Sequence, residues 1–199
     1  MQMDIEKFCY FSKAALAILP VIGFQPDIIH CHDWQAGLVP VFLKTLFAGQ
    51  DFYKDMKTIM TIHNLRFQGM TGMDRLMDMT GLHSDLFTED KMGSLGCGNM
   101  LKGGITYADK VTTVSETYAQ EIQTDYFGEK LDALLRYRKE DLVGIVNGID
   151  YDAYNPATDQ QIACSYDPNT FLDGKKKNKV ALQQETGLPE NPDKFVIGI

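Results

Sequence analysis

The chain has 199 residues, of which 44% are hydrophobic and 23% charged, and this ordinary composition excludes disordered and fibrous proteins. Its 27 acidic and 19 basic residues give a formal net charge of -8, which disfavours a nucleic-acid surface. The four cysteines lie far apart without a C-x-x-C pair, and no stretch approaches the roughly 20 apolar residues of a membrane span. We therefore expect reduced thiols and neither a nucleic-acid nor a membrane partner.

The first elements in chain order are a helix, a strand and a second helix. Apolar residues recur at three- and four-residue spacing over residues 4–22, which predicts a helix that ends at Gly23. The apolar run DIIHC (27–31) predicts a short buried strand. Apolar residues at helical spacing follow from 38 to 46, so a tight turn must connect this strand to a helix.

The alternation of strands and helices continues to the last residue. Further strands are predicted at 57–63, 110–115, 142–146 and 194–199. One helix is expected to end within residues 101–108, another to begin after an N-cap at Ser115, and a third to span residues 175–186. Almost continuously apolar strands that alternate with helices are typical of a parallel sheet. We therefore predict an α/β fold, a Rossmann-like parallel sheet with helices on both faces, and leave residues 66–98 unassigned.

Polar residues follow three of these strands where each strand ends. HCHD (30–33) follows the first strand, His63 and Asn64 close the second, and Asn147 with Gly148 follow the fourth. Ligands of open parallel sheets bind beyond the carboxyl ends of the strands. The sequence therefore predicts that a substrate binds along this rim.

A metal site at His30 and His32 is disfavoured. Alternate residues of a strand share a face, so the two imidazoles could point the same way. A metal ion needs a third and usually a fourth ligand, however, and the H-x-H-x-D-H pattern of metal hydrolases would need Asp and His where the chain has Trp34 and Gln35. We predict no metal ion and interpret His30 as a buried histidine with its hydrogen bond satisfied.

The other polar residues of the rim each have a structural and a functional interpretation. Asp33 could cap the following helix, contact a substrate, or do both. Asn64 and the Asn147-Gly148 dipeptide could be turn residues or could face the same substrate. HCHD (30–33) and HN (63–64) end two neighbouring strands, so their side chains should meet at one edge of the sheet. This favours the functional interpretation of these residues.

Two other kinds of chemistry are not supported by motifs. A G-x-S-x-G nucleophile elbow is absent, and Ser115 has no glycine near it. The glycine-rich LGCGNMLKGG (95–104) fits neither a dinucleotide fingerprint, which would need glycine at Leu101, nor a P-loop, because Lys102 precedes Gly103. Close helix packing explains these glycines better.

Four motifs in order resemble bacterial glycogen synthases and plant starch synthases: DIIHCHDWQAGLVPVFLK (27–44), TIHNLRFQG (61–69), LKGGITYADKVTTVSETYAQEI (101–122) and VNGIDYDAYNPATD (146–159). The resemblance implies a two-domain GT-B fold with ADP-glucose bound between the domains. It also implies retaining transfer of glucose to the non-reducing end of an α-1,4-glucan, without a metal ion or other cofactor, in the bacterial cytoplasm or in a plant plastid.

The same resemblance implies roles for four residues of the rim. His63 matches the active-site histidine of the family, which contacts the donor glucose near its 6-hydroxyl, and Asp33 matches an aspartate that these enzymes need for catalysis. Asn147 matches a residue that contacts the sugar, and Asn64 helps to shape the pocket. Gln35 stands where some relatives have histidine, and we assign it no chemical role.

The sequence also departs from the family. The K-T-G-G loop that binds the donor's phosphate region and the Arg and Lys pair that grips the diphosphate are absent, and the family's GLDGLL reads KLDALL, with Lys130 and Ala133 in place of two glycines. We therefore predict a central fragment that is inactive alone. Residues 1–143 would be the later part of the N-terminal, acceptor-side domain, and residues 144–199 the interdomain crossing and the start of the nucleotide-sugar domain.

Two alternatives remain at this stage. One is another retaining GT-B enzyme of the sucrose or trehalose-phosphate synthase type, for which the spacing from TIHN to NGID is not expected. The other is a non-catalytic glucan-binding module, which would present a stack of exposed aromatic residues, whereas the chain has one tryptophan, Trp34. The choice between ADP-glucose and UDP-glucose, and the oligomeric state, stay open.

Overall fold

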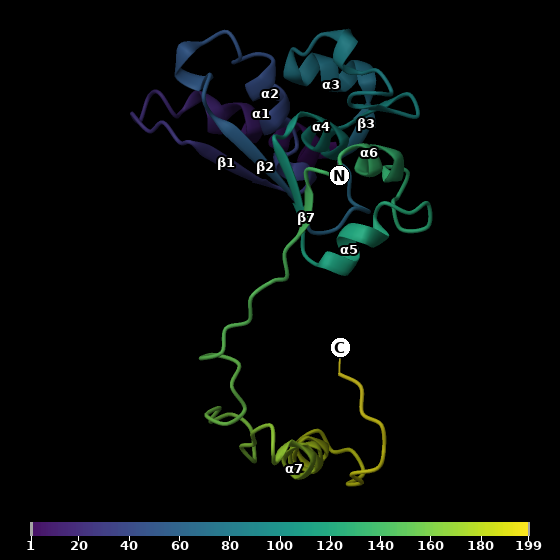
Figure 1. The fold of residues 1–199 in the computed structure, drawn as a ribbon. Coiled ribbons are helices and arrows are strands. Elements are labelled where there is room, and N and C mark those ends of the chain that lie inside the picture. Colours follow the sequence, from purple (N-terminus) through teal and green to yellow (C-terminus); the bar gives the residue numbers. More distant parts are fainter. Residues whose placement is uncertain (1, 199) are drawn as a thin grey trace. The chain divides into compact units, whose positions relative to one another are not determined.

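Four short strands that are rich in β-branched and apolar residues form one parallel sheet in the computed structural model, which describes residues 2–198 (Figure 1). The strands are β1 (Ile28–His32), β2 (Lys57–Ile62), β6 (Lys110–Thr113) and β7 (Leu142–Gly144), in that spatial order. Every neighbouring pair is parallel, with His32 opposite Thr61 and Thr61 opposite Thr112. The predicted α/β fold with a parallel sheet is confirmed.

The helices of this sheet gather on one of its faces. Because each new strand is added on the same side of the previous one, right-handed crossovers place α2 (Leu38–Lys44), α4 (Met100–Tyr107) and α5 (Glu116–Glu121) on the same face. Gly104 of α4 lies against Met60, and the first turn of α5 lies against Gly144. The sequence predicted helices on both faces of the sheet. In the described part of residues 1–147, the crossover helices cover this one face.

The two faces of the sheet differ accordingly in exposure. Cys31, Met60 and Val111 point under the helices and are at most 2% exposed. On the opposite face Ile28 is 55% and Val143 49% exposed. Solvent therefore reaches one face of the sheet along β1 and β7.

Glycines allow α2 and α4 to approach closely. A methyl group at Gly37, directly before α2, would collide with the carbonyl oxygen of Met100, and one at Gly104 would lie 3.0 Å from the Cα of Gly37. Lys102 in the same turn is buried and donates to the carbonyl oxygens of Glu89 and Gly93, both at 2.6 Å. Close helix packing is confirmed as the explanation of Gly103 and Gly104, which lie against Val41 and Gly37, but it is wrong for Gly96, a turn residue with φ +76°, and for Gly98, which lies in a strand.

The remaining helices and strands include several that the sequence left unassigned. Residues 70–99 contain an antiparallel sheet and a helix, and α1 packs against α2 and α3. The bounds are β3 (Met70–Gly72), β4 (Gly93–Ser94), β5 (Cys97–Asn99), α1 (Gln2–Ala17), α3 (Met73–Thr80) and α6 (Asp132–Tyr137). The predicted cap of α5 is confirmed, because the Ser115 hydroxyl accepts from the N–H of Tyr118.

The chain divides into two compact units, Met1–Asn147 and Gly148–Ile199. The predicted boundary falls after residue 143, inside β7. In the second unit α7 (Phe171–Glu185) forms where a helix was predicted, and Gly187 follows it with φ +69°. The strand predicted at 194–199 is wrong for residues 194–198, which are irregular, while residue 199 lies outside the described residues. A strand needs a neighbour, and residues 148–198 contain no other strand.

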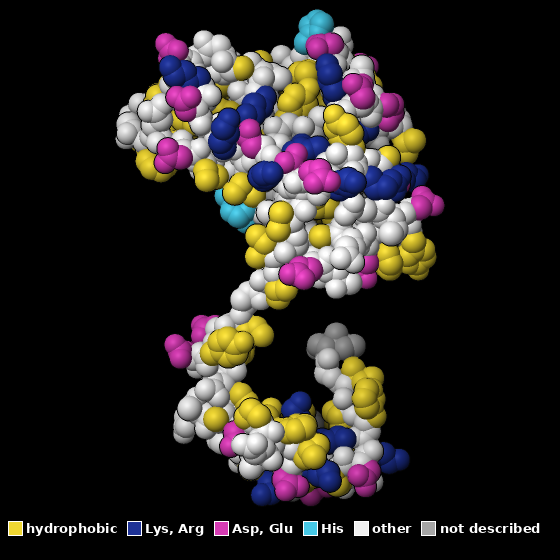
Figure 2. Space-filling model, viewed as in Figure 1, with side chains coloured by type: hydrophobic (Ala, Val, Ile, Leu, Met, Phe, Trp, Pro, Cys, Tyr) yellow, Lys and Arg dark blue, Asp and Glu magenta, His cyan; other side chains and the backbone are white. Residues whose placement is uncertain are grey.

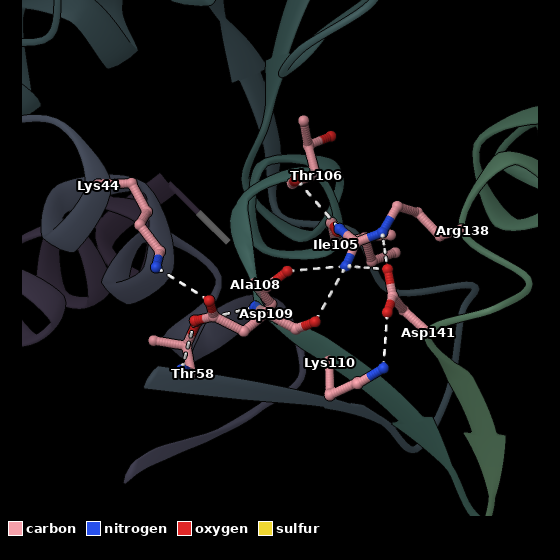
Figure 3. A network of polar contacts seen from close by, with 9 residues as sticks. All are labelled: Lys44, Thr58, Ile105, Thr106, Ala108, Asp109, Lys110, Arg138 and Asp141. Carbon is pink, nitrogen blue, oxygen red and sulfur yellow. Dashed lines mark hydrogen bonds and ion pairs between the residues drawn. The ribbon is translucent and has the colours of Figure 1, made fainter. Parts of the chain in front are cut away.

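A polar network holds the amino ends of the strands (Figure 3). Arg138 donates to the carbonyl oxygens of Thr106 and Ala108 at 3.1 and 2.8 Å, at the end of α4, and pairs with Asp141 at 3.3 Å. Asp109 accepts from the Thr58 N–H at 2.8 Å and is paired with Lys44. Burial alone would raise the pKa of Asp109, but these donors outweigh it and hold that pKa below its usual value.

Replacing Arg138 by Met should destabilise the first unit by about 2–3 kcal/mol, because several buried carbonyl oxygens lose a charged donor. Urea unfolding followed by circular dichroism measures the change. Arg136→Met is the matched control: this arginine is 52% exposed, pairs with Asp132 in its own helix and donates to the Gln123 carbonyl oxygen at the surface, so its loss should cost no more than about 1 kcal/mol. Equal midpoints for the two variants would contradict the role given to Arg138.

Replacing Lys130 by Gly should stabilise the chain by about 0.5–1 kcal/mol. Lys130 is exposed and has φ +68°, a left-handed conformation. This conformation costs a residue with a side chain about 1–2 kcal/mol and glycine almost nothing. The relief of this strain outweighs the stability lost because glycine has more conformational entropy in the unfolded chain. The same unfolding experiment applies. Lys139→Gly, at an exposed position without positive φ, should lower stability instead.

Candidate functional site

The ends of β1 and β2 are tied together by one carboxylate. Asp33 Oδ1 accepts the main-chain N–H of His63 at 2.8 Å and that of Asn64 at 3.4 Å. The Asp33 N–H in turn donates to the carbonyl oxygen of Thr61 at 2.9 Å, which extends the strand ladder by one residue. Three of the residues singled out in the sequence, Asp33, His63 and Asn64, are thus in direct contact at the carboxyl edge of the sheet.

Asp33 adopts an unusual main-chain conformation. Its φ of 53° and ψ of -172° lie in a region that is essentially restricted to glycine and costs of order 1–3 kcal/mol. Its side chain makes no capping hydrogen bond to the short helix Trp34–Ala36 that follows. The capping interpretation of Asp33 is therefore wrong: the strained turn directs the carboxylate across to the next strand.

Three histidines line the open face beside this bridge. His32 Nδ1 lies 3.0 Å from His63 Nε2, and the ring centroids of His30 and His32 are 4.2 Å apart. His30 Nε2 lies 2.6 Å from the Thr61 hydroxyl, which is 2.6 Å from the Thr112 hydroxyl. We call His30, His32 and His63 the histidine row; histidine side chains reach the surface at the lower edge of the first unit in Figure 2.

The exposure of the histidine row corrects one prediction. His30 was expected to be buried in its strand, but it is exposed because the helices cover the opposite face. Its hydrogen bond is nevertheless satisfied. Burial, and then the charges of His30 and His63, lower the pKa of His32, so that its neutral form is favoured. In residues 2–198 no three His, Cys, Asp or Glu side chains are arranged to hold a metal ion.

The loop after His63 is fixed by residues that sequence reasoning missed. The Leu65 N–H donates to the Tyr118 hydroxyl at 3.2 Å, and Gln68 donates to the carbonyl oxygens of Leu65 and Glu129. Asn64 forms a turn of its own by accepting the Arg66 N–H at 3.1 Å. Tyr118 is far from this loop in the sequence, and no local pattern indicates its contact.

A pocket of about 370 Å³ is lined by residues that follow Asp33 and Asn64 closely in the sequence. Its aromatic, polar and charged side chains include Trp34, Arg66, Phe67, Gln68, Glu129 and Lys130. Phe8 packs edge-on against Trp34 with centroids 5.2 Å apart, and Gly69, at φ +63°, lies against the indole where a side chain would collide. The indole is therefore held rigidly in the wall of a pocket that combines apolar surface with hydrogen-bonding groups.

Asn147 stands apart from the other predicted site residues. It follows β7 by three residues, is exposed, and makes no hydrogen bond to Asp33 or His63. Because β6 lies between β2 and β7, the ends of β2 and β7 are about 10 Å apart. Asn147 thus lies three residues beyond the end of β7, in an irregular segment, and does not hydrogen-bond to His63.

No helix within residues 2–198 combines the length and the apolar character needed to cross a membrane. This finding concerns the described helices only.

Known proteins with similar sequences match almost the whole chain. Residues 1–137 match the starch synthase catalytic domain family. The glycogen synthase of Lachnospira eligens is 59% identical over 196 residues, which cover 98% of this chain and 41% of that protein. The glycogen synthase of Geobacillus stearothermophilus is 48% identical over 190 residues, covering 96% of this chain and 39% of that protein.

A solved structure is similar as well. The catalytic domain of starch synthase IV from Arabidopsis thaliana, bound to ADP and acarbose, matches with a TM-score of 0.81 and 37% identity over 98% of this chain and 39% of that one. The chain thus spans about 40% of the length of the relatives that it matches. Since the family model covers well over half of its residues, the chain belongs to the starch synthase catalytic domain family.

Proposed function

We propose that the chain supplies the acceptor-side catalytic segment of a glycogen or starch synthase, which transfers glucose from ADP-glucose to the non-reducing end of an α-1,4-glucan with retention of configuration. The observation that carries this proposal is the bridge from Asp33 to His63 at the ends of adjacent parallel strands, within the family's matched region. The bacterial relatives are named glycogen synthases, and the plant structure holds ADP and acarbose.

His63 and Asp33 are the catalytic residues of this proposal. Loss of the diphosphate leaves positive charge on the sugar, so catalysis depends on dipoles and charges that are already in place. His63 contacts the donor glucose near its 6-hydroxyl. Asp33 holds the main chain of His63 with Oδ1, while Oδ2 has no hydrogen-bond partner within residues 2–198 and is free for a sugar hydroxyl. No metal ion or cofactor is required.

The other predicted residues help to bind the sugar. Asn147 contacts it from the segment that follows β7, and Asn64 shapes the pocket through its turn. The glucan acceptor binds in the pocket that Trp34 lines, where an indole face and neighbouring charged groups suit a sugar ring with its hydroxyls. The bacterial origin of the relatives favours the cytoplasm over a plastid.

A segment exchange tests the catalytic proposal. In the Lachnospira eligens glycogen synthase, the matching 196-residue segment is replaced by this chain. The exchanged enzyme should elongate glycogen with ADP-glucose, and His63→Ala and Asp33→Ala should each lower kcat by about 10²–10³-fold, as expected when a placed polar group is removed.

His83→Ala is the matched control for the exchange. His83 is exposed and paired with Asp85 rather than with the histidine row, so its loss should leave kcat unchanged. An exchanged enzyme without transfer, or one that prefers another donor, would refute the proposed function. Equal activities of the His63 and His83 variants would refute the role of His63.

The 199-residue chain alone should bind a malto-oligosaccharide without transferring glucose, because its sequence lacks the loops that grip the donor's phosphates. Trp34 is its one tryptophan and lines the pocket, so added maltoheptaose should change the intrinsic fluorescence in a saturable way. Calorimetry provides a readout independent of the indole, with Trp34→Ala expected to abolish binding. The exposed Phe11→Ala is the control. Transfer at normal synthase rates, or no binding heat, would contradict this expectation.

A further inference from the structure

We propose that His32 is a positioning residue for His63, holding its ring so that Nδ1 faces the donor sugar. This inference rests on the proposed function, in which His63 contacts that sugar. The structure places His32 Nδ1 3.0 Å from His63 Nε2, while His63 Nδ1 has no hydrogen-bond partner among the described residues. The bond to His32 occupies one ring nitrogen and leaves the other for a substrate.

The main chain of His63 is already fixed, so its ring orientation is the freedom that remains. Asp33 accepts the N–H of His63, and β2 ends one residue earlier in register with β6. A histidine on such a backbone can still turn about its side-chain bonds among several rotamers. The contact with His32 selects the rotamer in which Nε2 points along the sheet edge toward β1.

His32 is itself held from the other side. The ring of His30 lies against it at 4.2 Å with a 34° tilt, and His30 is bound through Thr61 to Thr112 on the third strand. The row, together with Thr61 and Thr112, therefore spans three strands of a sheet whose register is set by main-chain hydrogen bonds. A ring supported in this way can orient a neighbour more firmly than a solvent molecule can.

A hydrogen bond between two imidazoles contains one hydrogen and needs one free lone pair. If His32 donates, His63 carries its other hydrogen on Nδ1 and presents a donor; if His63 donates, its Nδ1 presents an acceptor. In either case His63 is held in a single tautomer. When both rings are protonated, neither has a lone pair and the bond breaks.

The charges around His32 favour the intact bond at neutral pH. Burial and the positive charges that His30 and His63 acquire on protonation lower the pKa of His32, while the carboxylate of Asp33 opposes them. The neutral form of His32 is therefore favoured, and the hydrogen bond to His63 is lost when both rings are protonated as the pH falls. Activity that depends on the pair should decline on the acid side for the same reason.

Imidazole ¹⁵N spectra of the histidine-labelled 199-residue chain test the pairing without any assay of function. His63 should show a single neutral tautomer and a coupling across the hydrogen bond to His32 Nδ1. In His32→Phe the His63 signals should change to a mixture of tautomers. His32→Asn, whose amide occupies nearly the position of Nδ1, should restore one tautomer without the acid transition of the pair.

His83→Phe is the matched control, because His83 is exposed and paired with Asp85 away from the row. It should leave the signals of His63 unchanged. His32 is exposed, so loss of the fold is not expected in its variants, and circular dichroism checks this. A tautomer mixture in the unmodified chain, or His63 signals that stay the same in the His32→Phe variant, would overturn the proposal.

The exchanged synthase separates this inference from the proposed function. His32→Phe should lower kcat by about tenfold or more, as small misplacements of catalytic groups do, while KM for ADP-glucose changes less. The acid limb of the pH profile should shift, and His32→Asn should recover much of kcat. If the unmodified exchange is inactive, the proposed function fails, whereas an active enzyme whose His32→Phe variant keeps kcat and pH profile refutes the positioning role alone.

Discussion

The hydrogen bonds from the main chain of His63 and Asn64 to Asp33 Oδ1 are the contacts on which the site depends. The ladder between β1 and β2 ends at His32 and Thr61, so beyond that pair the two loops are joined mainly by this carboxylate. An ionised acceptor makes stronger hydrogen bonds than a neutral one. The free energy gained from these hydrogen bonds offsets the main-chain strain at Asp33. The same bonds fix the position of the Asp33 carboxylate relative to the main chain of His63.

The two ends of the parallel sheet use polar groups in opposite ways. At the amino end, Asp109, Arg138 and Asp141 bind main-chain atoms and one another, and this stabilises the starts of the strands and the end of α4. At the carboxyl end, Asp33 and His63 each keep one polar atom without a partner in the described residues. A fixed amino end lets the opposite edge hold such groups in place before any ligand binds.

The sequence predicted the alternating strands and helices, the parallel sheet and the meeting of two strand ends, because each depends on local patterns in 27–33 and 57–64. It could not predict that His30 is exposed, since the open face follows from the spatial order of the strands. The strain at Asp33 and the contact of Tyr118 with Leu65 depend on distant neighbours. The irregular residues 194–198 have the composition of a strand but no partner to pair with.

The open face explains why imidazoles suit positions 30 and 32 better than the apolar residues of a buried strand. Apolar side chains there would be exposed beside Ile28, which adds to an apolar surface at an edge strand. Imidazoles at these positions instead make polar contacts with Thr61 and His63. The histidine row and the two threonines thus join three strands by polar contacts on this face.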